Sequence, residues 1–173
     1  GERRKIKNSI DRRDFTQNRV LTTPQHFAYV KIAEGCDNHC TYCAIPQIRG
    51  KYTSRKIEDI VSECEDLVNN YGVKEIILVA QDVSKFGHDL YGEIKLIELL
   101  DKLCKINVRW IRLLYLYPEN ISTELLDFMS KEEKMCKYLD IPLQHYSTNV
   151  LKMMNRKINT FDIDALIERI KSY

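Results

Sequence analysis

The sequence predicts an α/β fold built on parallel strands, and three observations lead to this fold class. The chain has 173 residues, of which 44% are hydrophobic and 30% are charged, as in a soluble domain with one sizeable core. Short apolar segments alternate with longer segments of helical periodicity. One segment, residues 75–80, is apolar on both faces, which is typical of a strand buried in a parallel sheet.

Four strands are expected, at residues 27–33, 75–80, 110–117 and 138–143, because these segments are continuously or alternately apolar. Helices are expected at residues 55–71, 94–104, 122–131, 147–156 and 160–172. The resulting order is β, α, β, α, β, α, β, α, α. Such alternation produces parallel strands joined by right-handed crossovers, with the chemistry at the carboxyl ends of the strands.

The first expected helix has a clear apolar face. Its apolar residues follow the spacing of one helix face and are Ile57, Ile60, Val61, Cys64, Leu67, Val68 and Tyr71. Ser54 is expected to cap its amino end, where Glu58 and Asp59 favour the positive end of the dipole. Gly72 is expected to end it.

The net charge of +2 hides a basic amino-terminal segment. Residues 1–20 carry seven basic and three acidic side chains, a balance of +4, which leaves 20 basic and 22 acidic side chains in the remainder. We interpret residues 1–24 as a basic linker, because no aromatic platform for nucleic-acid bases is interleaved; contact with nucleic acid is the alternative. Residues 25–173 are expected to form the core domain.

No segment of the sequence suggests a membrane or a secretory route. The longest aliphatic run, residues 76–80, is five residues long, whereas a membrane-spanning helix needs roughly 20. No apolar stretch follows the basic start, so no signal peptide is indicated. We therefore expect a cytoplasmic protein without a membrane partner.

The six cysteines fall into two groups. In a reducing compartment they are not expected to form disulfides. Cys36, Cys40 and Cys43 are clustered in one loop, whereas Cys64, Cys104 and Cys136 are dispersed in or beside helices, where we expect them to pack as small hydrophobic residues.

Polar or cysteine side chains also follow each expected strand directly. They lie at residues 34–36, 81–82, 115–117 and 144–145. Because the carboxyl ends of parallel strands meet at one edge of the sheet, we expect one polar, cysteine-lined pocket there. Gln81, Asp82 and Gln144 are candidate binding residues in it, since buried carboxylates and amides need partners.

Three thiolates at spacings of four and three residues can hold one corner of a small inorganic cluster. Soft thiolates select zinc, copper(I) or iron–sulfur centres. A structural zinc needs four ligands, and His39 is badly placed between two of the cysteines, although His26 or His145 could complete such a site through the fold. A non-catalytic, zinc-stabilised interaction domain is therefore one alternative. A 4Fe-4S cluster on three cysteines leaves one iron open for a small molecule, which indicates an enzyme.

The spacing C-x3-C-x2-C, with Tyr42 just before the last cysteine, resembles the signature of the radical S-adenosylmethionine (SAM) enzymes. The resemblance implies a partial (βα) barrel, with about four of six parallel strands present in this chain. It implies that Cys36, Cys40 and Cys43 hold a 4Fe-4S cluster, whose open iron chelates SAM. It further implies reductive cleavage of SAM to a 5′-deoxyadenosyl radical, with Tyr42 near the adenine. Gln81, Asp82 and Gln144 would then contact the ribose or the methionyl amine.

The resemblance narrows to the methylthiotransferase branch through residues 31–38, 44–50, 54–55, 78–82, 89–92 and 140–145. These segments are most similar to bacterial transferases that methylthiolate an aspartate β-carbon of small-subunit ribosomal protein S-twelve. The sister enzymes, which modify isopentenyl-adenosine of tRNA, are the alternative; residues 33–34 and 80–82 favour the protein-modifying group. The implied partners are ribosomal protein S-twelve and an electron donor such as flavodoxin or ferredoxin.

The sequence departs from the family pattern in three ways. Ala80, Gln81 and Asp82 stand where many radical enzymes have Gly-Gly-Glu. No second cysteine triplet precedes Cys36, and the chain stops after four expected strands. We therefore expect an incomplete radical-SAM core that binds the cluster and SAM weakly and cannot complete the modification alone. RNA contact is expected only through regions that this chain lacks.

Overall fold

The computed structural model describes residues 21–173 and contains a three-stranded parallel sheet. Its strands β1 (Phe27–Lys31), β4 (Glu75–Val79) and β5 (Trp110–Leu113) lie in the order β1-β4-β5. Residues 1–20, which hold most of the expected basic linker, lie outside the described residues. Leu21 already packs against the core, and the Thr23 hydroxyl donates to the Phe27 carbonyl at 2.9 Å.

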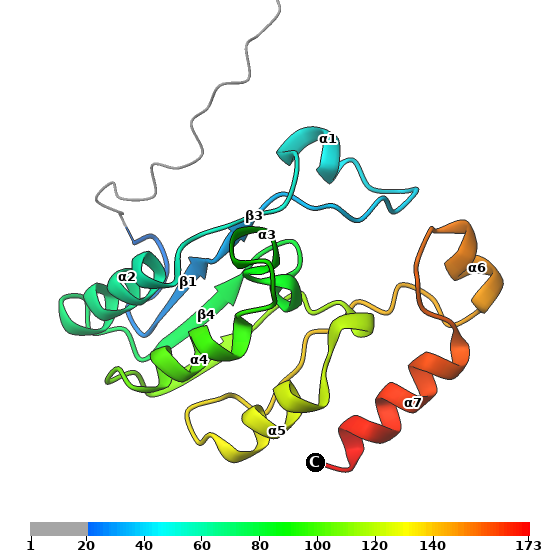
Figure 1. Cartoon of the computed structure of the whole chain (residues 1–173). Helices are drawn as coiled ribbons and strands as arrows, with labels where there is room; N and C mark the ends of the chain where they lie inside the picture. Colours follow the sequence, from blue (N-terminus) through cyan, green and yellow to red (C-terminus); the bar gives the residue numbers. More distant parts are fainter. Residues whose placement is uncertain (1–20) are drawn as a thin grey trace, which may run out of the picture.

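Helices alternate with the three strands of this sheet, as expected (Figure 1), although the first expected strand divides into β1 and a two-residue strand outside the sheet, and no strand separates the last three helices. The helices are α1 (Ile45–Arg49), α2 (Ile57–Asn69), α3 (His88–Tyr91), α4 (Leu96–Cys104), α5 (Thr123–Lys131), α6 (Thr148–Met153) and α7 (Thr160–Lys171), with short 3-10 turns η1 (Val83–Lys85) and η2 (Pro118–Asn120). Because the parallel strands lie side by side in chain order, right-handed crossovers bring successive helices to the same face of the sheet. This arrangement is a segment of a (βα) barrel, and the predicted α/β fold class is confirmed.

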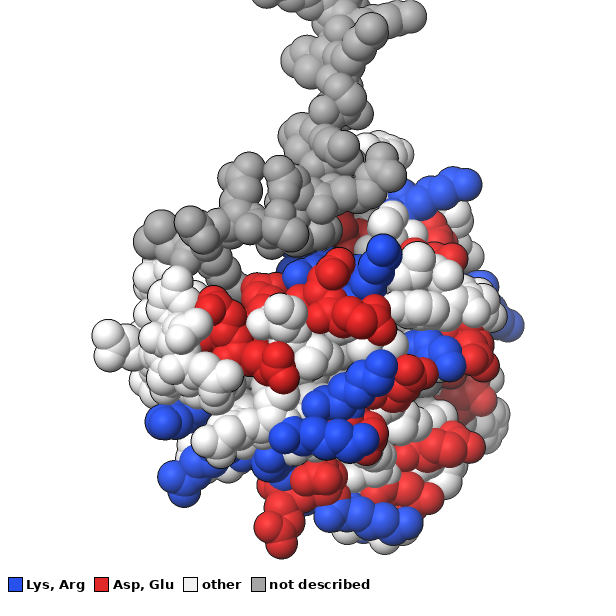
Figure 2. Space-filling view, turned by 60° about the vertical axis from the view of Figure 1, so that its left-hand side comes forward, with Lys and Arg blue, Asp and Glu red and all other residues white. Residues whose placement is uncertain are grey.

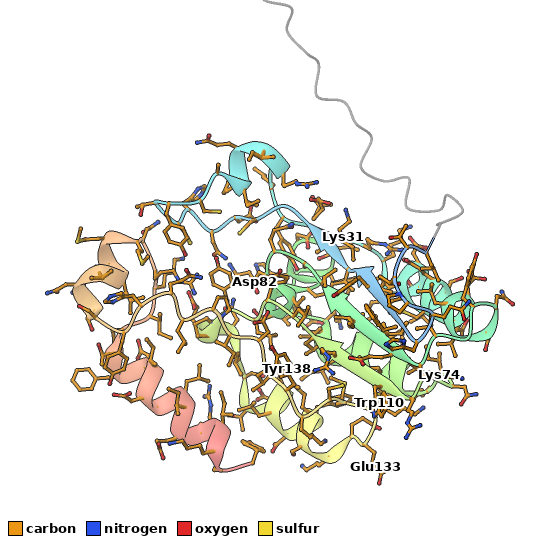
Figure 3. All side chains as sticks on the ribbon, turned by 180° about the vertical axis from the view of Figure 1, so that it is seen from behind. Lys31, Lys74, Asp82, Trp110, Glu133 and Tyr138 are labelled. Carbon is orange, nitrogen blue, oxygen red and sulfur yellow. The ribbon has the colours of Figure 1, made fainter. Side chains whose placement is uncertain are left out.

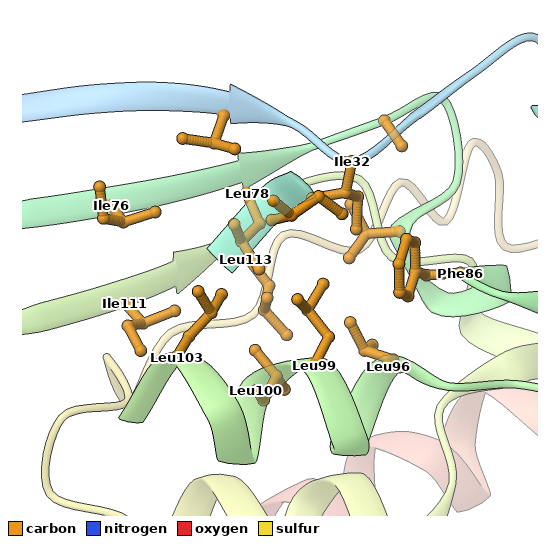
Figure 4. Packing of buried hydrophobic residues seen from close by; sticks show 14 of the residues in the cluster. Ile32, Ile76, Leu78, Phe86, Leu96, Leu99, Leu100, Leu103, Ile111 and Leu113 are labelled. Carbon is orange, nitrogen blue, oxygen red and sulfur yellow. The ribbon is translucent and has the colours of Figure 1, made fainter. Parts of the chain in front are cut away.

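The main core lies between the sheet and α4 (Figure 4). The buried residues of α4 are spaced three, four and seven apart, so one face of this helix is apolar. They are Leu96, Leu99, Leu100 and Leu103, and they pack with Ile76, Leu78, Ile111 and Leu113 of the sheet. Each fully buried leucine contributes about 1.5–3 kcal/mol of transfer free energy. Cys64 of α2 is fully buried in the same core, as predicted.

The outer surface of these helices carries both signs of charge. Lys102 of α4 lies 3.5 Å from Glu98 on its own helix and 3.9 Å from Glu58 on α2. Figure 2 shows Lys and Arg interspersed with Asp and Glu among the described residues on this side. Exposed ion pairs of this kind add little stability, and a mixed pattern does not attract a polyanion such as nucleic acid.

The opposite face of the sheet is more open (Figure 3). There Tyr29 and Trp110 remain 41% and 42% exposed. Arg112 forms an ion pair with Glu75 at 2.5 Å, and its guanidinium lies 5.1 Å from the centre of the Tyr138 ring. The strands therefore bury one face against helices, while the other displays aromatic and charged side chains.

The fourth expected strand, residues 138–143, is not a strand in the structure. The segment before it hydrogen-bonds with Ile111, whose N–H donates to the Lys134 carbonyl at 2.8 Å. A further bond, from Leu116 N–H to the Asp140 carbonyl, measures 2.9 Å. Between these two points Tyr115 has a φ of +64°, which turns the backbone out of the β region and interrupts the ladder. The same residue explains why β5 ends at Leu113 rather than at residue 117.

The prediction that Ser54 caps α2 is wrong. Ser54 lies in β3 (Thr53–Ser54), and its hydroxyl donates to Asp89 Oδ1 at 2.6 Å. The first N–H of α2, that of Ile57, instead donates to the Tyr91 hydroxyl at 3.1 Å. The α3 segment therefore satisfies a donor that the helix itself leaves open.

Within residues 21–173, every helix is too short or too polar to cross a lipid bilayer.

Candidate functional site

The three clustered cysteines lie in a loop whose two ends are paired. We call residues 35–50 the cysteine loop. β2 (Ala33–Glu34) precedes it and pairs in antiparallel fashion with β3, which follows it. The Cys36 N–H also donates to the Gly50 carbonyl at 3.1 Å. The loop is therefore closed at its base and attached at the carboxyl end of β1, where the sequence predicts the site.

Gly35 is required at this closure. Its φ is +80°, in the left-handed region that favours glycine. A Cβ at this position would lie 2.2 Å from the Lys51 carbonyl oxygen and 2.7 Å from that of Gly50. Only a residue without a side chain lets the two ends of the cysteine loop approach so closely.

The thiols of the loop are largely withdrawn from solvent. Cys36 and Cys40 are each 6% exposed, and Cys43 is half-buried. The Asn38 N–H donates to Cys36 Sγ at 3.4 Å, and the Cys43 N–H donates to the Cys40 carbonyl at 3.1 Å. Burial raises the pKa of the Cys36 thiol. The loop thus presents soft donors in a sheltered place, as an iron–sulfur cluster requires.

The arrangement does not favour a zinc ion. Among residues 21–173, no three His, Cys, Asp or Glu side chains are grouped to hold a single metal ion. His26 precedes β1, and its carbonyl accepts from the N–H groups of Lys74 and Glu75, at the end of the sheet opposite the cysteine loop. His145 Nδ1 accepts from the Ser147 N–H at 2.9 Å, which occupies one of the two ring nitrogens. A cubane cluster differs from zinc because each thiolate binds its own iron, so the sulfurs need not converge on one point.

Three of the expected strand ends meet at the cysteine loop. Cys40 Sγ lies 3.6 Å from the hydroxyl of Tyr117, which follows β5. Lys85, in the turn after β4, donates to Asn38 Oδ1 at 3.0 Å. These contacts span 77 and 47 residues of sequence, so the parallel sheet brings three of the four expected strand ends together; the fourth expected strand does not form.

The predicted binding residues have different surroundings. Asp82 is fully buried, where it accepts from the Ser84 N–H at 3.1 Å and from Asn120 Nδ2 at 3.3 Å. Burial raises the pKa of this carboxyl, and its oxygens are occupied within the protein. Gln81 is different, because its Oε1 is buried and has no hydrogen-bond partner among the described residues.

Tyr42, in the cysteine loop, and Gln144, before α6, are both exposed to solvent. Tyr42 is 51% exposed, and partial burial together with the neighbouring Cys40 raises its pKa. Gln144 has a φ of +68°, an uncommon conformation for a residue other than glycine. Tyr115 and Asn155 also have a positive φ, and of these three residues Asn155 contacts the cysteine loop, through the His39 carbonyl.

Arg156 is a site residue that sequence reasoning missed. Its side chain is 1% exposed, with NH1 4.0 Å from Cys40 Sγ and the guanidinium 4.1 Å from the centre of the Tyr117 ring. Glu119 lies 3.8 Å away as its counter-charge. The contact with Cys40 spans 116 residues, so no local pattern could have revealed it.

Two buried polar atoms near the strand ends lack hydrogen-bond partners in the described part of the chain, and they indicate which chemical groups a ligand could offer. Arg156 Nε is buried without a hydrogen-bond partner among the described residues, as is Gln81 Oε1. A buried acceptor and a buried donor both cost free energy until a ligand pairs with them. An ammonium group pairs with an acceptor such as Gln81 Oε1, and a carboxylate pairs with a guanidinium such as that of Arg156, so these two side chains have the chemistry that the two ends of a zwitterionic amino acid require.

Comparisons with known proteins identify the family of this chain. Residues 30–173 match the model of the Radical SAM superfamily. The chain is 53% identical over 155 residues to the ribosomal protein uS12 methylthiotransferase RimO of Alkaliphilus oremlandii, an alignment that covers 89% of this chain and 35% of that protein. It is 56% identical over 154 residues to the protein of the same name from Clostridium tetani, covering 88% of this chain and 34% of that protein. The chain thus spans about a third of the length of these curated relatives.

A solved structure supports the fold at lower sequence similarity. The radical S-adenosylmethionine methyltransferase TsrM from Kitasatospora setae, with cobalamin and a 4Fe-4S cluster bound, superposes with a TM-score of 0.65. The two sequences are 15% identical, and the match covers 84% of this chain and 29% of that chain. Because the family model covers most of the sequence and the fold agrees, this chain belongs to the radical SAM superfamily.

Proposed function

We propose that this chain is the SAM-cleaving core of a methylthiotransferase that modifies an aspartate of ribosomal protein uS12, the S-twelve protein of the small subunit. One observation carries the chemical part of the proposal: three cysteines lie in a closed, sheltered loop at the carboxyl end of a parallel sheet. The similarity to relatives named uS12 methylthiotransferase carries the choice of substrate over tRNA.

In this proposal Cys36, Cys40 and Cys43 hold a 4Fe-4S cluster. When bound, such a cluster supplies the electron that cleaves SAM and yields a 5′-deoxyadenosyl radical. The chain's own part is to exclude water from the thiolates and to hold SAM in one orientation, which the burial of Cys36 and Cys40 supports. Keeping water out of a radical site prevents side reactions.

The residues around the loop have separate parts in binding SAM. Gln81 Oε1 accepts from the methionyl ammonium and Arg156 donates to the carboxylate, since each has an unsatisfied buried atom. Tyr42, exposed beside Cys43, offers an aromatic face to the adenine, and the exposed amide of Gln144 is assigned to the ribose. Asp82, whose oxygens are occupied, is assigned a positioning part, because it caps η1 and so fixes Lys85 beside Asn38.

The activity of the whole protein also needs partners. The radical would take a hydrogen atom from the aspartate β-carbon and leave as 5′-deoxyadenosine. The carbon radical would then bond to the sulfur of a methylthio group, and a second cluster that supplies this group would accept the remaining electron. We assign the second, sulfur-supplying cluster to protein outside this chain, which represents about a third of the relatives' length. An electron donor of the flavodoxin or ferredoxin class reduces the cluster in the cytoplasm, where ribosomal proteins are made.

Mass spectrometry on the complete protein that carries this segment tests the proposal. The reconstituted protein, SAM and a reductant are incubated anaerobically with uS12 in one reaction and with tRNA in another. We expect a methylthio group on an aspartate of uS12, unmodified tRNA, and no product with the Cys40→Ala variant. Modified tRNA with unmodified uS12 would overturn the choice of substrate, and product from Cys40→Ala would overturn the assigned chemistry.

A further inference from the structure

The turn that ends α6 contacts the tip of the cysteine loop. We call residues 153–156 the α6 turn. Thr41, in the middle of the loop, donates through its hydroxyl to the Met153 carbonyl at 3.0 Å. Its N–H donates to the Met154 carbonyl at 3.2 Å. Thr41 thus makes two hydrogen bonds to a segment more than 110 residues away in sequence, opposite the base that Gly35 and Gly50 close.

Asn155 adds a third hydrogen bond to the same tip. Its side-chain Nδ2 donates to the His39 carbonyl at 2.7 Å. His39 and Thr41 flank Cys40, so the three bonds hold the backbone on both sides of this thiol. His39 and Thr41 are both exposed, so apolar burial does not hold the backbone on either side of Cys40, and the polar contacts do.

The residue type at position 155 carries the inference. The Asn155 N–H donates to the Lys152 carbonyl at 3.0 Å, and the Arg156 N–H donates to the Leu151 carbonyl at 2.9 Å. With φ of +54° at Asn155, this is a Schellman ending, whose left-handed position is usually glycine. Glycine would serve the helix end at lower conformational cost. Asparagine has a higher conformational cost in this position, but its side chain forms the hydrogen bond with His39 that glycine cannot form.

The α6 turn is also attached to a rigid support. Leu151, Ile158 and Ile163 form a small separate core, against which Leu143 packs. This core joins α6 to α7 independently of the main core under the sheet. Leu166 of α7 is buried in the main core, so α7 links this small core to the barrel, and a contact made from the α6 turn fixes the loop tip relative to the barrel.

We propose that Asn155 and Thr41 are positioning residues that fix Cys40 for cluster binding before any iron is present. The part concerning the cluster rests on the proposed function; the ordering of the loop tip does not. The three hydrogen bonds restrict the backbone of residues 39–41, so the Cys40 thiol is held where the cluster needs it. Loss of one bond should loosen this segment without unfolding the domain.

Two pairs of variants test the proposal in the full chain. Asn155→Gly keeps the left-handed backbone and removes only the side-chain bond, and Thr41→Val removes the hydroxyl donor. Thr41→Ser restores the donor, and Lys152→Ala alters an exposed residue of α6 as the matched control. Hydrogen exchange of residues 39–41 is measured on the metal-free protein, and loss of iron to a chelator is measured after anaerobic reconstitution.

We expect Asn155→Gly and Thr41→Val to speed exchange at the Thr41 amide, whose N–H donates to the Met154 carbonyl, by about three- to tenfold, the range of one lost hydrogen bond. Both should lose iron several-fold faster, while Thr41→Ser and Lys152→Ala match the wild type. Unchanged exchange would overturn the ordering of the tip, and faster exchange with unchanged iron loss would overturn the positioning of Cys40. A wild type that binds no iron would refute the cluster instead, and the exchange result would still stand.

Discussion

The sheet with α2 and α4 and the cysteine loop are held together by different means. α4 places four leucines, each no more than 2% exposed, against the strands. The cysteine loop has α1 as its only helix, and this helix buries no residue. The loop is instead fixed by the Gly35 closure at its base and by hydrogen bonds to the α6 turn at its tip.

This difference separates stability from function within one chain. Apolar burial supplies most of the free energy of folding and needs only the right spacing of apolar residues. A site that must bind a cluster and a polar small molecule requires defined backbone positions and unsatisfied polar groups. Those features contribute little stability, so the apolar core under the sheet has to supply the free energy of folding for the whole domain.

Truncation of the α4 core should have the largest effect on stability. Leu100→Ala removes a fully buried side chain and should lower the free energy of unfolding by about 2–5 kcal/mol in urea titrations. Lys102→Ala on the exposed side of the same helix should change it by less than about 1 kcal/mol. Equal effects of the two substitutions would mean that α4 does not carry the core.

A substitution at the base of the cysteine loop should have the second largest effect on stability. Gly35→Ala places a Cβ against the Lys51 carbonyl and forces a left-handed conformation, so we expect a loss of about 2–3 kcal/mol. Gly72→Ala is the matched control: φ there is +70°, but no atom lies within 4 Å, so only the conformational cost of about 1 kcal/mol remains. Thermal or urea unfolding measures both, and a Gly72→Ala effect as large as that of Gly35→Ala would contradict the close approach.

The smallest effect concerns a dispersed cysteine. Burial raises the pKa of the Cys104 thiol from 9.0 to about 11. The folded state therefore keeps the proton while the unfolded state releases it, so this contribution to stability is complete below pH 9 and is lost as the pH rises to about 11. Between roughly pH 8.5 and 10.5, under reducing conditions, the free energy of unfolding of the wild type should fall more than that of Cys104→Ala. Parallel profiles would show that the thiol is not shielded.

Much of the main core could be predicted from the sequence, because its signals are local. The apolar run that forms β4 and the leucine spacing of α4 are visible in short windows, and the position of the cysteine loop follows from the strand before it. The closure by β2 and β3 could not be predicted, since each of these strands has two residues and shows no periodicity.

The site was predictable in position but not in detail. The sequence indicates that Asp82 and Gln81 lie at a strand end, yet only the fold reveals that Asp82 is enclosed by Ser84 and Asn120 while Gln81 keeps an unsatisfied oxygen. Tyr115 interrupts the fourth expected strand through its positive φ, which cannot be predicted from the sequence because aromatic residues rarely adopt it. Arg156 reaches Cys40 through tertiary structure alone.

The central claim is that the six cysteines divide into three cluster ligands and three packing residues. Its most direct test is anaerobic iron–sulfide reconstitution of the chain and its six single Cys→Ala variants, followed by iron analysis and absorbance spectroscopy. We predict cluster absorbance in wild type, its loss in the variants at Cys36, Cys40 and Cys43, and its retention per folded molecule in those at Cys64, Cys104 and Cys136. Equal spectra in the two sets, or zinc without iron in anaerobically purified protein, would contradict the account.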